Sequence, residues 1–126
     1  MKRNEPLQAL TKAEEEVMQI IWTLDRCLVK DIIEHLGDPD IPHSTVSSVV
    51  RILEKKGFVD HKAYGKTHEY FPIVSKEDYA LHGVQSLMEK YFDSSPKQLV
   101  SFLVQKNDIG LKDLNELMQM LAPKKN

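Results

Sequence analysis

Cysteine is almost absent from this 126-residue chain, which contains Cys27 and no other cysteine. A single thiol cannot form an intrachain disulfide, and no second cysteine is spaced to share a metal ion with it. Both absences are typical of a protein that works in a reducing cytoplasm. We expect Cys27, in a short connection between two helices, to be a small buried residue and not a redox sensor.

Long apolar runs are missing as well. The segment MKRNEPLQAL at the N-terminus lacks the apolar core of a signal peptide, and no run approaches the roughly 18 apolar residues of a membrane span. The motifs of serine hydrolases, zinc proteases and phosphate-binding loops are also missing. The sequence therefore predicts a cytoplasmic protein that makes no direct membrane contact, is not an enzyme and needs no cofactor.

A large excess of charge of either sign is missing too, since the formal net charge is −2. A total near zero does not indicate a nucleic-acid partner, but the charge is unevenly distributed. Residues 43–76 hold six Lys and Arg against three Asp and Glu, a local charge of +3, whereas residues 14–16 are three consecutive glutamates. A DNA-binding protein needs positive charge only on the face that meets phosphate.

Apolar residues recur at helical spacing in three early segments, which predicts helices over about 12–24, 29–36 and 43–56. Thr11 and Glu14 have the T-x-x-E spacing of a capping box at the start of the first helix. Strands are predicted over 58–63 and 67–73, joined by a turn at 64–66. Further helices are predicted over about 76–92, 96–105 and 111–121.

The order of three helices and a hairpin predicts a winged helix-turn-helix domain. We expect a mainly α protein with a small β-hairpin wing. Residues 1–74 would form the DNA-binding domain, and residues 75–126 would form a C-terminal helical dimerisation region.

The third predicted helix has a face suited to DNA. Its apolar stripe is Val46, Val49, Val50 and Leu53, and the opposite face is made of small polar residues and Arg51. Short side chains let a helix enter the major groove, which is about 12 Å wide, and arginine can reach a guanine edge or a phosphate. The predicted DNA-binding residues, wing lysines included, are Ser44, Thr45, Ser47, Ser48, Arg51, Lys55, Lys62 and Lys66.

Interpretations of these residues that involve no DNA contact remain open. The polar helix face would then be a solvated surface, and the two wing lysines would be solvated hairpin charges. His61 and His68 are expected to face each other across the hairpin, but two histidines alone make a poor metal site. We therefore expect no metal.

The C-terminal segment is more apolar than a free-standing tail requires. Residues 99–104, LVSFLV, are apolar around almost the whole helix circumference. We expect a second copy to bury them in a two-fold homodimer, which would set two recognition helices on a palindromic operator in double-stranded DNA. The alternative is that the tail folds back on its own wing. The predicted dimerisation residues are Leu99, Val100, Phe102, Leu103, Leu114, Leu117, Met118 and Leu121.

Four segments of the sequence are similar to those of one known family: LTKAEEEVMQIIW at 10–22, STV at 44–46, RILEKKG at 51–57 and HEYFP at 68–72. The chain resembles the BlaI/MecI family of penicillinase repressors over nearly its whole length. The resemblance implies a homodimeric repressor that binds inverted repeats upstream of β-lactamase or related genes. By position it places Thr45, Ser47, Ser48 and Arg51 in the recognition helix and Lys62 and Lys66 in the wing.

The resemblance also implies how repression would end. In that family a membrane-bound sensor metalloprotease detects the β-lactam, and the repressor is cut before a phenylalanine in the tail. The corresponding bond here joins Ser101 and Phe102, where well-known members have asparagine in place of the serine. The cysteine cluster of the related copper-responsive repressors is missing from this tail, which disfavours copper sensing.

Two other functions stay open. A repressor could be gated directly by a small ligand bound near Tyr79, Tyr91 and Phe92, although such aromatic residues are more often core. A winged helix can also serve as a protein-interaction module, but the polar face of the third helix argues against it.

Overall fold

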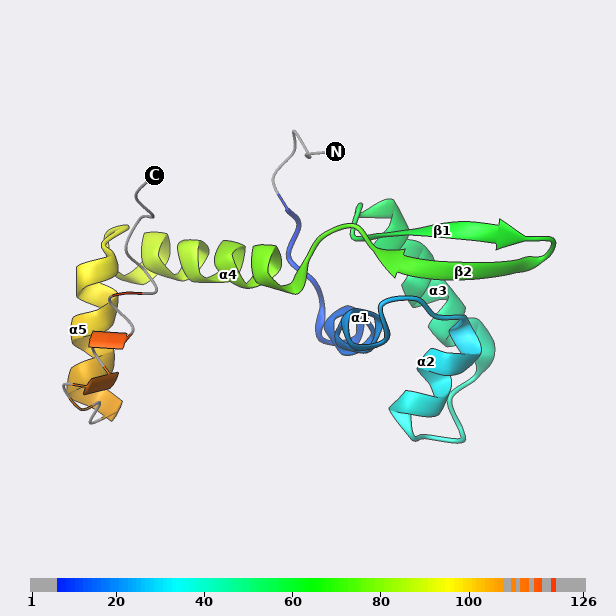
Figure 1. The fold of residues 1–126 in the computed structure, drawn as a ribbon, viewed down its shortest axis with the longest axis horizontal. Helices are drawn as coiled ribbons and strands as arrows, with labels where there is room; N and C mark the ends of the chain where they lie inside the picture. The colour runs from blue at the N-terminus through cyan, green and yellow to red at the C-terminus, as the bar shows by residue number, and fades with distance from the viewer. Residues whose placement is uncertain (1–6, 108–109, 111, 114, 117–118, 120–126) are drawn as a thin grey trace. The chain divides into compact units, whose positions relative to one another are not determined.

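We describe the fold from a computed structural model, which describes residues 7–107, 110, 112–113, 115–116 and 119. Its elements follow the order α1 (Lys12–Leu24), α2 (Val29–Leu36), α3 (His43–Lys55), β1 (Val59–Tyr64), β2 (Thr67–Pro72), α4 (Lys76–Tyr91) and α5 (Pro96–Asn107) (Figure 1). The predicted mainly α fold with a β-hairpin wing is confirmed. The chain divides into two compact units, a winged unit of residues 1–81 and a helical unit of residues 82–126.

The predicted bounds of α1 and α2 are confirmed, and the other elements shift by one or two residues. The largest consequence concerns Phe58, which was predicted to begin the first strand. It instead joins α3 to β1: its N–H donates to Leu53 at 2.9 Å, and its carbonyl accepts from Ile73 at 2.9 Å and Val74 at 3.3 Å. Its side chain is fully buried. A bulky residue at such a joint is fixed by packing, which strand periodicity does not report.

The winged unit is built around one buried cluster. The apolar stripes of α1, α2 and α3 meet beneath the base of the hairpin, and a fully buried side chain of this kind contributes roughly 1.5–3 kcal/mol. The buried members are Val17, Met18, Ile21, Cys27, Ile32, Val46, Val50, Leu53, Phe58, Val59, Tyr70 and Val74.

The predicted capping box of α1 is confirmed. The Glu14 N–H donates to Thr11 Oγ1 at 3.2 Å, and the Thr11 N–H donates to Glu14 Oε1 at 3.1 Å. The structure adds a partner that the sequence did not predict, since Lys56 forms an ion pair with Glu14 and donates to the Ala9 carbonyl at 3.3 Å. This contact joins the first turn of α1 to the residue that follows α3.

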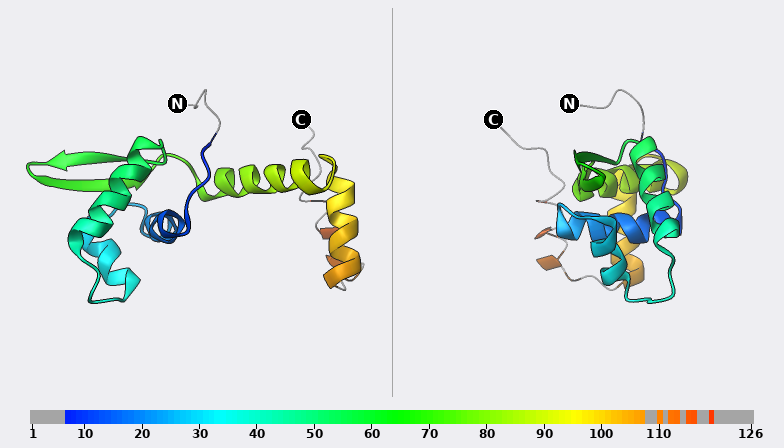
Figure 2. Two further views of the ribbon diagram at one scale, coloured as in Figure 1. Left: turned by 180° about the vertical axis from the view of Figure 1, so that it is seen from behind. Right: turned by 90° about the vertical axis from the view of Figure 1, so that its right-hand side faces the viewer.

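Strands β1 and β2 pair antiparallel, with Val59 opposite Pro72, His61 opposite Tyr70 and Tyr64 opposite Thr67. The hairpin projects beyond the helices of its unit to a free tip (Figures 1 and 2). Gly65, with φ of +64°, is the first of the two turn residues, where a type II′ turn requires a positive φ.

Cys27 is buried, as predicted, and its backbone extends the sheet. Its N–H donates to the Tyr70 carbonyl at 3.0 Å, and the Tyr70 N–H donates to the Cys27 carbonyl at 2.7 Å. Burial, reinforced by the nearby carboxylates of Asp31 and Glu69, raises the pKa of the Cys27 thiol to about 11. A thiol that stays protonated at neutral pH is a poor nucleophile, which fits a structural residue.

The first turn of α4 belongs to the winged unit. Ser75 caps the helix through Oγ, which accepts from the Asp78 N–H at 3.0 Å, and Trp22 Nε1 donates to the Val74 carbonyl at 2.8 Å. The Tyr79 hydroxyl accepts from the Leu10 N–H at 2.9 Å, and the Tyr79 ring packs edge-on against Phe58. These contacts carry the compact unit beyond residue 74, where the domain boundary was predicted, to Leu81.

The helical unit contains the rest of α4 and α5. Ser95 Oγ caps α5 by accepting from the Gln98 N–H at 3.1 Å, and the rings of Phe92 and Phe102 lie 5.3 Å apart. Four predicted dimerisation residues lie outside the described residues: Leu114, Leu117, Met118 and Leu121. None of the described helices combines the length and the apolar character that crossing a lipid bilayer requires.

Candidate nucleic-acid interface

Helix α3 has a buried apolar face and a largely polar exposed face. Val46, Val50 and Leu53 are buried against the other helices of the winged unit, and Val49 is half-buried. On the opposite face, five of the predicted DNA-binding residues are exposed: Ser44, Thr45, Ser48, Arg51 and Lys55. The sixth, Ser47, is half-buried at the edge of this face. The predicted orientation of the helix is therefore confirmed.

Arg51 and Lys55 stand four residues apart, which places them on one side of α3. Within the described part of the chain, neither side chain forms an ion pair or a hydrogen bond. The next residue, Lys56, differs from these two because its positive charge is neutralised by an ion pair with Glu14. The two charges on the exposed face thus remain available to a phosphate or a base edge.

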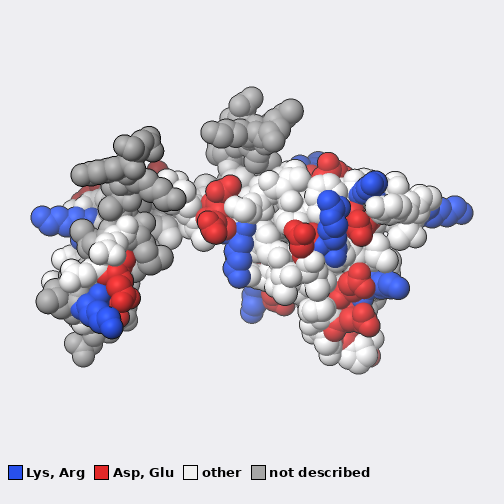
Figure 3. Space-filling view, in the orientation of Figure 1, with Lys and Arg blue, Asp and Glu red and all other residues white. Residues whose placement is uncertain are grey.

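The two wing lysines have different settings. Lys62 lies opposite Glu69, on the face of the hairpin that points away from buried Tyr70, and its ammonium sits 5.4 Å from the centre of the Tyr64 ring. Lys66 is exposed in the turn. Figure 3 shows basic side chains at the far end of the wing, whereas acidic and basic side chains are interspersed over the rest of the visible face of this unit.

A groove of about 410 Å³ brings part of the predicted site together. Ser47 of α3 and Lys66 of the wing both line it, and so do three residues that were not predicted, Lys30, His43 and His68. Nothing in the local sequence pattern singles out Lys30, because the other polar residues that line the groove lie at least 13 positions away along the chain. Lys62 does not line this groove.

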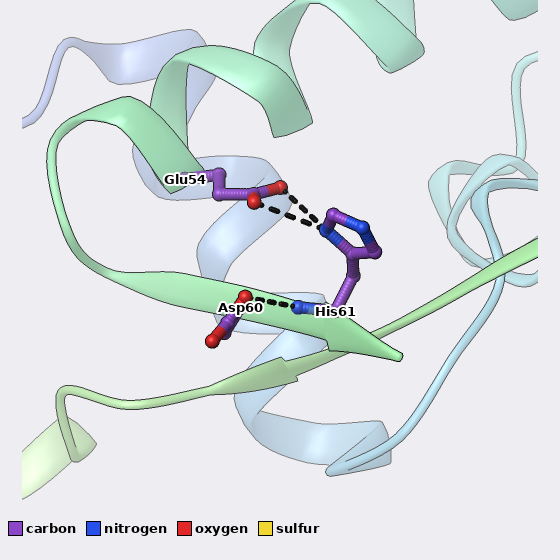
Figure 4. A group of neighbouring side chains, drawn as sticks. All are labelled: Glu54, Asp60 and His61. Atoms are coloured by element: carbon purple, nitrogen blue, oxygen red, sulfur yellow. Dashed lines mark hydrogen bonds and ion pairs between the residues drawn. The ribbon is translucent and has the colours of Figure 1, made fainter. Parts of the chain in front are cut away.

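Glu54, Asp60 and His61 join the last turn of α3 to the wing (Figure 4). His61 Nδ1 lies 3.0 Å from both carboxylate oxygens of Glu54, and Asp60 Oδ1 accepts from the His61 N–H at 2.8 Å. One ligand atom from each residue lies within 4.8 Å of the others. Carboxylate and imidazole are metal ligands, but the contacts present are those of a hydrogen bond between Glu54 and His61 that holds the wing on α3.

The predicted pairing of the histidines is confirmed, since the rings of His61 and His68 stack at 4.1 Å. Behind them, burial raises the pKa of Tyr70; the Glu54 carboxylate adds to the rise, and Arg51 opposes it. Glu54 was not predicted as the partner of His61. The two residues are seven positions apart across a joint, so no helical or strand period connects them.

Three packed helices, a two-stranded wing and an exposed polar face on the third helix define a winged helix-turn-helix protein. A family model described as penicillinase repressor matches residues 10–123, and the chain belongs to this family. Its members are DNA-binding regulators and not enzymes, so the chain is a transcriptional repressor of this family.

Curated relatives are similar over most of their length. The methicillin resistance regulatory protein MecI of Staphylococcus aureus (strain N315) is 29% identical over 116 residues, which cover 91% of this chain and 94% of MecI. The penicillinase repressor of Bacillus licheniformis is 25% identical over 118 residues, or 93% and 92% of the two chains. An uncharacterised 16.5 kDa protein of Latilactobacillus sakei is 28% identical, over 91% and 80%.

Proposed function

We propose that this repressor acts in the cytoplasm as a homodimer on an inverted-repeat operator in double-stranded DNA, upstream of β-lactamase or related genes. The observation that carries the proposal is the exposed face of α3. Its small polar residues would let the helix enter the major groove, where Arg51 could pair with a guanine edge. Lys55, Lys62 and Lys66 would contact phosphates on either side of the helix.

The homodimer is supported by the apolar surface of the helical unit. Leu87, Tyr91 and Phe92 of α4 and its end line an apolar pocket of about 490 Å³ together with Leu99, Phe102 and Leu103 of α5. Tyr91 is 71% exposed and Phe102 is 44% exposed. Apolar surface of this kind marks an interaction site, and a second copy of the same unit would bury it across a two-fold axis.

A directly bound small ligand is less well supported as the inducer. Tyr79, one of the three aromatic residues considered for such a site, packs against Trp22 and Phe58 in the winged unit. Tyr91 and Phe92 line the apolar pocket, and Tyr79 does not.

We propose that a sensor metalloprotease instead relieves repression by cutting between Ser101 and Phe102. Both residues are exposed within α5. The helix would have to unfold locally around this bond before a protease could bind the backbone in an extended conformation. The cut would remove much of the apolar surface of the helical unit, and with it the avidity that two linked half-sites provide.

The proposal is tested with the DNA upstream of the chain's own gene. In a gel-shift titration we expect two protein copies per palindromic site, and affinity that falls steeply between 50 and 200 mM salt. Analytical ultracentrifugation of the free protein should give a dimer. A monomer that binds the upstream fragment no better than a scrambled duplex would contradict the proposal.

A further inference from the structure

The groove between α2, α3 and the wing tip is lined by positive and hydrogen-bonding groups without an opposing charge. Lys30 reaches it from α2, His43 from the start of α3, Lys66 from the turn of the wing and His68 from β2. None of the described Asp or Glu residues lines the groove, although the chain has 19 acidic residues against 17 Lys and Arg. This asymmetry indicates an anionic ligand.

Carboxylates near the groove have other partners. Asp31, next to Lys30, accepts from the Leu28 N–H at 2.8 Å, and Glu69, next to His68, pairs with Arg26 at 3.5 Å. Glu54 is held by His61. Among the described residues, Lys30 and Lys66 form no ion pair, so their charges are not neutralised within the chain.

The side chains that line the groove suit a phosphate group. Half-buried Ser47 offers a short hydroxyl side chain, and the lysine and histidine side chains around it are exposed. Ser47 belongs to the same helix as Ser44, Ser48 and Arg51, so a phosphate in the groove would flank bases read by α3. Phosphate contacts of this kind fix the register of a protein on the duplex.

We propose that this groove binds one backbone phosphate of the operator, with Lys30 and Lys66 supplying charge and His43, His68 and Ser47 supplying hydrogen bonds. The proposal rests on the proposed function and adds Lys30, His43 and His68 to the DNA-contacting residues. It assigns Lys30 to clamping the backbone from the side of α2, opposite the wing, so that one phosphate is held from both sides.

The test compares Lys30→Gln and Lys66→Gln with Lys12→Gln. Lys12 is an exposed lysine in the first turn of α1, which the Glu14–Lys56 ion pair places beside the C-terminal end of α3, whereas the groove lies at its N-terminal end. Affinity for the upstream fragment and for a scrambled duplex is measured by fluorescence anisotropy from 50 to 200 mM salt. Unfolding followed by the fluorescence of Trp22, the single tryptophan, verifies that each variant folds.

We expect each groove variant to weaken both duplexes alike and to reduce the slope of log affinity against log salt by about 0.9, so that the variant loses about 3.5-fold less affinity than the wild type over this salt range. Lys12→Gln should keep the wild-type slope. Unchanged slopes in the groove variants would overturn the proposal. Failure of the wild type to prefer the upstream fragment would instead count against the proposed function.

Uncharged methylphosphonates, placed one at a time along the fragment, locate the phosphate. We expect one position at which the methylphosphonate weakens binding of the wild type but does not weaken binding of Lys30→Gln, because the variant has already lost the contact with that phosphate. A free phosphate ligand is the other source of the same chemistry, and inorganic phosphate is its probe. If Lys30→Gln abolished inorganic phosphate binding but left the DNA salt slope unchanged, the groove would belong to a free ligand and the proposal would be wrong.

Discussion

In the winged unit, side chains from α1, α2, α3 and both strands bury one another completely, with Met18, Ile21, Ile32 and Phe58 wholly inaccessible. In the described part of the helical unit, Val100 is the one apolar side chain that is buried, at 8% exposure, while Val84, Leu87 and Tyr91 stay exposed along α4. The first unit has a closed core of its own, and the described part of the second unit has apolar surface left uncovered. The difference supports the proposal that DNA recognition resides in the winged unit and association in the helical unit.

Removing the largest fully buried side chain of the winged unit should give the largest of the expected effects and should separate the stabilities of the two units. Phe58→Ala leaves a cavity between α3, β1 and Tyr79, and should lower the free energy of unfolding of the winged unit by about 3–5 kcal/mol. Denaturant unfolding followed by Trp22 fluorescence measures it. Phe92→Ala, in the helical unit, is the matched control and should move the Trp22 transition much less. Equal losses would mean that the two units share one core.

A charge in the apolar pocket should break association and spare the winged unit. We expect Phe102→Glu to convert the dimer to a monomer and to weaken operator binding by about 100-fold or more, because the second half-site no longer adds avidity. Sedimentation and gel shifts measure both effects, and the Trp22 transition should persist. Gln105→Glu places the same charge on an exposed position of α5 and should leave the dimer intact. If the Phe102→Glu protein remained a dimer, the apolar pocket would not be part of the interface.

The recognition face can be divided by two neighbouring substitutions. Arg51→Ala should weaken operator binding by about 1–3 kcal/mol and reduce the preference over a scrambled duplex, because a base contact carries sequence information. Lys55→Ala, one turn away, should weaken both duplexes alike, because a phosphate contact does not. Competition gel shifts with the two duplexes give the ratio. If Arg51→Ala left that ratio unchanged, Arg51 would be a phosphate contact.

The sequence predicted those elements whose signals are local. The bounds of α1, the capping box of Thr11 and Glu14, and the buried stripe of α3 all follow from spacings of three and four residues. The exposed face of α3 follows from the same period. What escaped prediction depends on the tertiary approach of residues that no helical or strand period connects: the backbone pairing of Cys27 with Tyr70, the hydrogen bond between His61 and Glu54, and the presence of Lys30 and Lys66 in one groove.

Glu14 takes part both in a local interaction, the capping box with Thr11, and in a tertiary one, the ion pair with Lys56. Its substitution should give the smallest of the expected effects. Burial raises the pKa of Glu14, but the hydrogen bond and charge of Lys56 and the hydrogen bonds from the Thr11 N–H and side chain outweigh it, so the pKa lies below its usual value of 4.5. A carboxyl group whose pKa is lower in the folded state stabilises the fold above its unfolded pKa, and this contribution is lost as pH falls through the folded value.

We therefore expect Glu14→Gln to lower the free energy of unfolding of the winged unit by about 1 kcal/mol at pH 7, because glutamine can keep the capping hydrogen bond but loses the ion pair with Lys56. The gap between wild type and variant should narrow as pH falls below about 4.5, because the wild-type carboxylate is then protonated and loses its ion pair with Lys56. Glu16→Gln, an exposed neighbour on α1, should show no such gap. If the difference in free energy of unfolding between wild type and variant stayed constant with pH, the effect would belong to the hydrogen bonds of the capping box. The ion pair with Lys56, which only the tertiary fold supplies, would then contribute nothing to stability.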